Sequence, residues 1–352
     1  MTVGGYLLWW NMSKKEKLIL IVGIAVIVIC TVFVLFMLDR SSVIRIFPRP
    51  APKQEKVIEL DNLGSADTPI GKTAVVTIFC NDKLTKWDFT TDNDKQTRKN
   101  DFCSLKIATD WLSEQGKKYN KDCDFVIPND EDSDLYYETA FKNIVGNAVQ
   151  AFDKEEEWKY IESNIDSESL KKKYNCDNII YLLFTNNYDA ELKNDDEIII
   201  NSYVVNVYDK ANAYPYELAC LSKFADTDRI APSIIAHEIL HLFGAPDLYC
   251  FDAIGLNYGT TPEFVEYCRE NNNKDIMLST LDSETGVALP NRITQEITDI
   301  TAYYIGWLET APDCIDEYLL VHSQHEYKNR KEINLQSVSY THLRAHETLM
   351  NL

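Results

Sequence analysis

The hydrophobic pattern of the chain begins with one long apolar run near the N-terminus. Residues 18–38 are 21 consecutive positions without a charged side chain. Such a run forms a helix about 31 Å long, which is enough to cross the hydrocarbon core of a bilayer. A cleavable signal peptide would have a shorter apolar core. We therefore predict a short cytoplasmic N-terminus at residues 1–17 and one transmembrane helix at residues 18–38.

The segment at residues 39–70 is polar and contains several prolines, which is typical of an extended linker. Lys14, Lys15 and Lys17 precede the apolar run, and three arginines follow it within the linker. The number of positive charges is nearly equal on the two sides of the run, so it gives only a weak preference for one orientation. The lysines, however, directly adjoin the run, as they do in a signal-anchor. We therefore expect residues 39 onward to lie outside the cell.

From residue 71 the pattern alternates between β-branched runs, which favour strands, and segments with helical spacing. Strands are predicted at residues 73–80, 124–128, 178–184, 197–209 and 214–224. The last two are expected to be outer strands of the sheet, so that an edge strand precedes the helix that carries His237. Helices are predicted at residues 104–120, 135–164 and 293–308. One further helix is expected to follow Asp228 as its cap, with Pro232 in its first turn. This order predicts an α/β (α+β) fold with a mixed twisted sheet, in one domain that spans residues 71–320.

The helix after Pro232 carries the motif H-E-x-x-H-x-x-G-x-x-D, which runs from His237 to Asp247. On a helix His237 and His241 share one face, where two imidazoles suit zinc and Glu238 can act as general base on a zinc-bound water. Gly244 ends the helix, because glycine enters a left-handed turn without steric cost. The reversal can bring Asp247 back as a third ligand, which leaves the fourth position open, as in catalytic zinc sites.

This motif resembles the long signature of the metzincin clan of zinc metallopeptidases, whose last ligand is a histidine. With Asp247 in that position, in the run G-A-P-D-L-Y, the chain is similar to snapalysin-type and immune-inhibitor-A-type peptidases. Met277, in the run D-I-M-L-S, resembles the Met-turn of the clan, whose methionine forms a hydrophobic floor beneath the metal and is not a ligand. The resemblance covers about residues 71–308. It implies helices and a sheet in an upper subdomain and an irregular lower subdomain after the zinc helix.

Two alternatives stay open at this site. Asp247 departs from the histidine of the clan, so Glu263, Glu266 or Asp252 is an alternative third ligand. A lone methionine is more often ordinary core packing than a functional residue, although the position of Met277 after the zinc motif favours the Met-turn.

The net charge of −20 and the pI near 4.7 argue against binding to a nucleic-acid backbone, which requires a basic patch. Acidic clusters at residues 129–134 and 194–197 offer oxygen ligands for calcium as a second cofactor. Neither cluster has the spacing of a known calcium loop, so solvated loops are the favoured interpretation.

Eight of the nine cysteines follow the apolar run, and no C-x-x-C pair indicates a structural zinc ribbon. An even number in an oxidising space suits disulfides, and we predict a bridge between Cys250 and Cys268. Buried thiols are the alternative. Residues 337–352 differ in character from the rest and are predicted to be a non-native tail, so His342 and His346 are not expected to be ligands.

These features predict a single-pass, membrane-anchored zinc endopeptidase that hydrolyses peptide bonds of extracellular proteins or peptides. One alternative is a catalytically silent domain of the same fold that serves binding or adhesion, although such domains commonly lose the general base that Glu238 would be. Another is a zinc hydrolase with a non-peptide substrate.

Overall fold

The computed structural model describes residue 66 and residues 68–148, 154–189, 198, 200–205, 217–224, 227–249, 261–318 and 320. The chain divides into two compact units, Met1–Lys56 and Val57–Leu352, and every described residue belongs to the second. The predicted N-terminus at residues 1–17, the transmembrane helix at 18–38 and the tail at 337–352 lie outside the described residues. Among the helices that the structure describes, none has the length and hydrophobicity to cross a bilayer.

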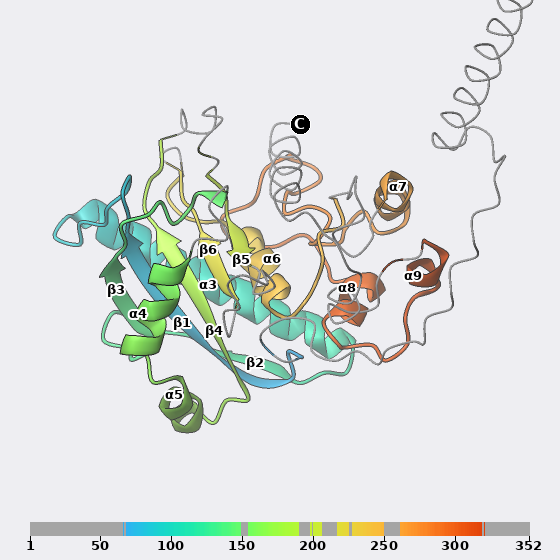
Figure 1. Cartoon of the computed structure of the whole chain (residues 1–352). Coiled ribbons are helices and arrows are strands. Elements are labelled where there is room, and N and C mark those ends of the chain that lie inside the picture. Colours follow the sequence, from blue (N-terminus) through green and yellow to red (C-terminus); the bar gives the residue numbers. More distant parts are fainter. Residues whose placement is uncertain are drawn as a thin grey trace, which may run out of the picture. The chain divides into compact units, whose positions relative to one another are not determined.

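A six-stranded, mostly parallel sheet forms the centre of this unit (Figure 1). The central strand, β1 (Gly71–Asn81), pairs in parallel with β2 (Cys123–Val126), β3 (Tyr136–Ala140) and β4 (Asn178–Thr185). β6 (Leu218–Leu221) continues the sheet in parallel beyond β4, and β5 (Tyr203–Val205) is antiparallel to β6. The resulting order is β2-β1-β4-β6-β5, which confirms a mixed α/β fold.

Helices cover both faces of the sheet, because alternate residues of β1 enter two hydrophobic cores. Val75 and Phe79 belong to the core that contains α3 (Asp92–Lys118) and α6 (Pro232–Leu242). Three β1 residues, Ala74, Val76 and Ile78, belong to the core under α4 (Glu155–Asn164) and α5 (Ser167–Tyr174). Figure 1 shows α4 and α5 on one side of the sheet and α3 and α6 on the other.

The chain after α6 has less regular structure, as the sequence predicted. It forms three short helices, α7 (Pro262–Asn271), α8 (Asp299–Tyr304) and α9 (Asp313–Glu317), joined by turns and loops within residues 261–318. α8 lies within the predicted helix at 293–308 but is much shorter.

The predicted helix at residues 135–164 is wrong over its first part. Tyr136–Ala140 forms β3 along the end of β1, residues 141–148 form a loop, and α4 begins at Glu155. Phe141 and Ile144 are buried although they lie in that loop. The spacing of these apolar residues therefore looked helical, because the hydrophobic pattern of a sequence depends on which residues are buried and not on the backbone conformation.

The prediction of two outer strands is correct for residues 197–209, where β5 lies at the end of the described sheet, and wrong for residues 214–224. β6 lies between β4 and β5, and its four residues are fully buried. β5 ends the sheet in the described part of the chain, so an internal strand directly precedes α6. The apolar run L-A-C-L is typical of a strand covered on both faces.

The start of α6 also differs from the prediction. Pro232 occupies its first turn as expected, but the cap position is Ala231, with no side-chain cap. Asp228 instead binds the side chains of Arg229 and Asn100.

The described cysteines are free thiols in the structure: Cys80, Cys103, Cys123, Cys176, Cys220, Cys268 and Cys314. Cys250, the predicted partner of Cys268, lies outside the described residues, so that bridge stays a prediction.

Candidate metal centre

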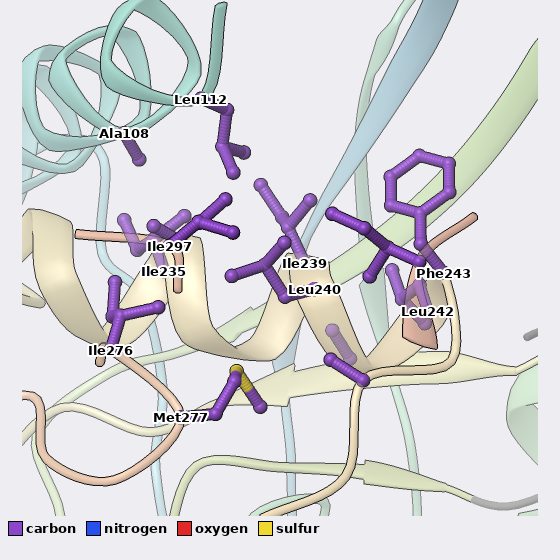
Figure 2. Close-up of a cluster of buried hydrophobic side chains, with 14 of the residues drawn as sticks. Ala108, Leu112, Ile235, Ile239, Leu240, Leu242, Phe243, Ile276, Met277 and Ile297 are labelled. Atoms are coloured by element: carbon purple, nitrogen blue, oxygen red, sulfur yellow. The ribbon is translucent and has the colours of Figure 1, made fainter. Parts of the chain in front are cut away.

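The helix α6 holds the two histidines of the motif in the core of the molecule. Ile235 and Ile239 point toward Ala108 and Leu112 of α3, whereas Met277 lies on the other side of α6 (Figure 2). Because α6 is packed on both sides, its side chains have little freedom to move.

The chain reverses direction directly after α6. Gly244 has a φ of +98°, which only glycine adopts at low cost, and its N–H donates to His241 O at 2.8 Å. The N–H of Ala245 donates to Leu240 O at 3.1 Å, which closes the end of the helix. This turn returns the chain toward α6, as the sequence predicted for Gly244.

The reversal brings Asp247 against the two imidazoles. Asp247 Oδ1 lies 3.1 Å from His237 Nε2 and 3.2 Å from His241 Nε2, and the two Nε2 atoms are 3.1 Å apart. Ligand atoms at about 2.0–2.1 Å from a tetrahedral zinc ion lie about 3.3 Å from one another. The three atoms are therefore spaced as one face of a zinc tetrahedron, and the group can hold a metal ion.

Both histidine rings are fixed by backbone carbonyl oxygens on their other nitrogen. His237 Nδ1 donates to Ile276 O at 3.0 Å, and His241 Nδ1 donates to Ala245 O at 2.7 Å. A carbonyl oxygen only accepts, so a neutral ring carries its proton on Nδ1 and presents the Nε2 lone pair to Asp247. Two lone pairs and a carboxylate oxygen at one point form a donor set that a cation stabilises.

The electrostatics of the ligands favour a positive charge at this point. Burial lowers the pKa of His241, but the Asp247 and Glu238 carboxylates and the Ala245 carbonyl together outweigh burial and raise that pKa to about 9. A divalent cation competes with that proton for the same carboxylate and the same ring nitrogen.

Glu238 lies beside the three ligand residues and is itself 1% exposed. Burial raises the pKa of its carboxyl group, while His237 and His241 lower it. Its Oε2 atom is buried and has no hydrogen-bond partner among the residues that the structure describes. A buried carboxylate oxygen without a donor is costly, so Glu238 Oε2 is able to accept a hydrogen bond at this site.

Met277 is fully buried in the core cluster that includes the packed face of α6. Its carbonyl oxygen accepts the N–H of Leu248 at 2.9 Å, next to Asp247. The segment around Met277 therefore contacts the loop that carries the third candidate ligand.

The structure does not place the alternative third ligands at the histidines. Glu263 and Glu266 are exposed on α7, where Glu266 pairs with Arg269 at 3.3 Å. Asp252 lies outside the described residues.

The group of His237, His241 and Asp247 is the one candidate metal cluster within the described ranges. In the acidic segment at residues 129–134, Asp134 pairs with Lys173 and Glu131 pairs with Arg98, so two of these carboxylates have basic partners. The second acidic segment, at residues 194–197, lies outside the described residues.

Sequence reasoning missed the residues that support the ligands. Asp275 is fully buried and accepts hydrogen bonds from the turn and from α8, and Tyr249 stacks on the His237 ring with centroids 6.1 Å apart. Both residues lie inside the runs that indicated the motif and the Met-turn. Their places in the chain beside the motif residues were the only signal that the sequence offered.

No protein family and no curated protein sequence matches this chain in the comparisons with known proteins. The function of the chain is therefore inferred from the fold and from the geometry of the candidate metal centre.

Proposed function

We propose that this chain is a zinc-dependent endopeptidase of the metzincin kind, with His237, His241 and Asp247 as metal ligands and Glu238 as general base. The observation that carries the proposal is the buried Glu238 carboxylate, whose Oε2 has no described donor, beside a three-ligand group with zinc-like spacing. A structural zinc site has four protein ligands, whereas the described residues bring three together here, as catalytic sites do. When bound, zinc supplies Lewis acidity that makes water more acidic and polarises a substrate carbonyl.

Glu238 performs the proton transfers in this proposal. Its carboxylate accepts a proton from the attacking water and then donates that proton to the amine that leaves. Burial raises the pKa of the carboxyl group, which brings it closer to the pH at which one group can act as both base and acid. The hydrogen bonds from both Nδ1 atoms keep the two imidazoles fixed throughout.

In this proposal an extended peptide binds along β5, the last strand of the sheet among the described residues. β5 ends the described sheet and contacts α6, which carries the histidines. A substrate strand that adds antiparallel to such an edge gains backbone hydrogen bonds and a defined register. Peptides or proteins are therefore the proposed substrates, and the apolar run at residues 18–38 is the proposed membrane anchor.

The test compares the full-length wild type with Glu238→Gln in a peptide-library cleavage assay at equal zinc content. Removing a general base typically lowers turnover by about 10²–10⁴-fold. We expect a loss of that size with unchanged zinc, because Glu238 is not a ligand. Glu263→Gln, on the exposed side of α7, is the control and should cleave at the wild-type rate.

Equal cleavage by Glu238→Gln and the wild type would rule out Glu238 as the base. If the zinc-loaded wild type cleaves no peptide, the silent binding domain or a hydrolase of another substrate replaces the peptidase.

A further inference from the structure

The turn that contains Met277 offers two successive carbonyl oxygens to the metal centre. Ile276 O accepts the Nδ1 proton of His237 at 3.0 Å. Met277 O accepts the N–H of Leu248 at 2.9 Å, one residue after Asp247. A single turn therefore contacts the ring of one ligand and the backbone beside another.

Asp275 holds this turn in place with both carboxylate oxygens. Its Oδ1 accepts the N–H of Met277 at 2.8 Å and the hydroxyl of Thr301 at 2.8 Å. Its Oδ2 accepts the N–H of Thr298 at 3.0 Å, the Thr298 hydroxyl, and the Thr301 hydroxyl at 2.9 Å. These bonds join the turn to the first residues of α8.

A fully buried carboxylate is expensive unless donors surround it. Asp275 has backbone and side-chain donors on both oxygens, and the backbone adds further restraints, since Ile276 N–H donates to Glu296 O at 3.0 Å. An exposed turn would need no such arrangement. Because Asp275 Oδ1 holds the Met277 N–H, it fixes the Ile276–Met277 peptide and with it the direction of the Ile276 carbonyl oxygen. The Leu278 N–H donates to Asp275 O at 3.0 Å, which fixes the next peptide and the direction of the Met277 carbonyl oxygen.

We propose that Asp275 is a positioning residue of the metal centre, which orients the Ile276 and Met277 carbonyl oxygens so that His237 and the Asp247 loop are set for the ion. This role rests on the proposed function only in requiring that the centre binds zinc. Thr301 extends the same role, because its hydroxyl contacts both oxygens of Asp275.

The experiment measures metal affinity of the full-length protein in detergent, without substrate. Zinc affinity is determined by competition with a chromophoric chelator, and the visible spectrum of the cobalt-loaded protein reports ligand geometry. Loss of a group that orients a ligand typically costs 10–100-fold in metal affinity. We expect Asp275→Asn and Thr301→Val to raise the zinc dissociation constant by about 10–100-fold and to alter the cobalt spectrum. Thr301→Ser keeps the hydroxyl and should restore both values.

Asp82→Asn is the matched control for loss of a buried carboxylate. Asp82 also accepts several backbone hydrogen bonds, from Leu84, Thr85 and Val145, and Val145 belongs to the core on the other face of the sheet. The Asp82→Asn variant should be less stable than the wild type but should keep the wild-type zinc affinity and cobalt spectrum.

Folded Thr301→Val with wild-type affinity and spectrum would overturn the positioning role, and so would an equal loss of affinity in Asp82→Asn. If Asp275→Asn does not fold, the comparison of Thr301→Val with Thr301→Ser decides whether Asp275 has the positioning role. A wild type that binds zinc but cleaves no peptide would contradict the peptidase and leave the positioning role standing. A wild type that binds neither metal would overturn both.

Discussion

Asp247 brings a negative charge to a position where the long metzincin signature has a neutral imidazole. Its Oδ1 lies within 3.2 Å of both histidine Nε2 atoms, and its side chain is 1% exposed. The attraction between this carboxylate and a cation is weakly screened in such a buried place. Asp247 therefore supplies the main charge complementarity to a divalent ion.

The first prediction concerns this ligand. Asp247→Ala should raise the zinc dissociation constant by more than about a hundredfold, since even changes beyond the direct ligands cost 10–100-fold. The variant should stay folded, because packing of α6 against α3 does not depend on Asp247. Competition with a chromophoric chelator gives the affinity, and circular dichroism gives the fold.

Glu263→Ala and Glu266→Ala are the controls for Asp247→Ala, and both should bind zinc as the wild type does. If Glu263→Ala or Glu266→Ala loses zinc while Asp247→Ala keeps it, the third ligand comes from α7.

The candidate ligands were predictable because their geometry is local. His237, His241 and Asp247 lie on one helix and the turn that follows it, so helical spacing and one glycine define their arrangement. The supporting groups were not predictable in this way. Every residue has a carbonyl oxygen, so the sequence does not mark Ala245 or Ile276 as acceptors. Asp275 depends on Thr301, which follows it by 26 positions.

At the scale of elements, α6 is held from its N-terminal side by α3. Asp101 of α3 is fully buried and accepts the N–H of Ile230, just before α6, at 2.9 Å. Burial raises the pKa of Asp101 to about 7, against the opposing effects of that hydrogen bond, Lys223 and Arg229. In the unfolded chain the pKa returns to about 3.9.

This difference in pKa predicts how stability depends on pH. Between about pH 4 and pH 7 the folded state keeps the Asp101 proton and the unfolded state releases it, so the free energy of unfolding falls as pH rises. The contribution of Asp101 should decline by on the order of a few kcal/mol across this window. Asp101→Asn should lack it, which denaturant titrations at several pH values can measure.

Asp110→Asn, at an exposed position of the same helix, serves as the control and should keep the wild-type pH dependence. If Asp101→Asn and the wild type lose stability in parallel from pH 4 to pH 7, Asp101 does not hold its proton in the fold.

Elements were predictable where the residue pattern has a single explanation. The strands β1 and β4 are long β-branched or apolar runs, and they lie where the sequence placed them. The helix prediction at residues 135–164 failed because Phe141 and Ile144 are buried in a loop. The start of α3 at Asp92 was missed, since its first turns carry mostly polar residues that show no apolar face.

In the whole molecule, residues 18–38 are the proposed membrane anchor, and residues 71–320 are the proposed catalytic unit outside the cell. The fold agrees with the sequence as a mixed α/β unit, but strand order depends on contacts between distant segments. β6 was expected near the outside and lies inside the sheet, because its pairing with β4 has no local signature.

The topology leads to a prediction for intact cells. If residues 39 onward lie outside, a protease added to the medium should release the zinc-binding unit, and an antibody to that unit should detect its loss. A cytoplasmic protein in the same cells is the control for integrity. Full protection of the unit until the cells are opened would reverse the proposed orientation.

The zinc X-ray absorption spectrum of the full-length protein, measured together with its zinc content, tests directly whether His237, His241 and Asp247 bind zinc. We expect one zinc per chain, with two imidazole nitrogens and oxygen ligands at about 2.0–2.2 Å and no sulfur. His241→Ala should lose most of this zinc. A sulfur ligand at about 2.3 Å, or full zinc content in His241→Ala, would contradict the metal centre.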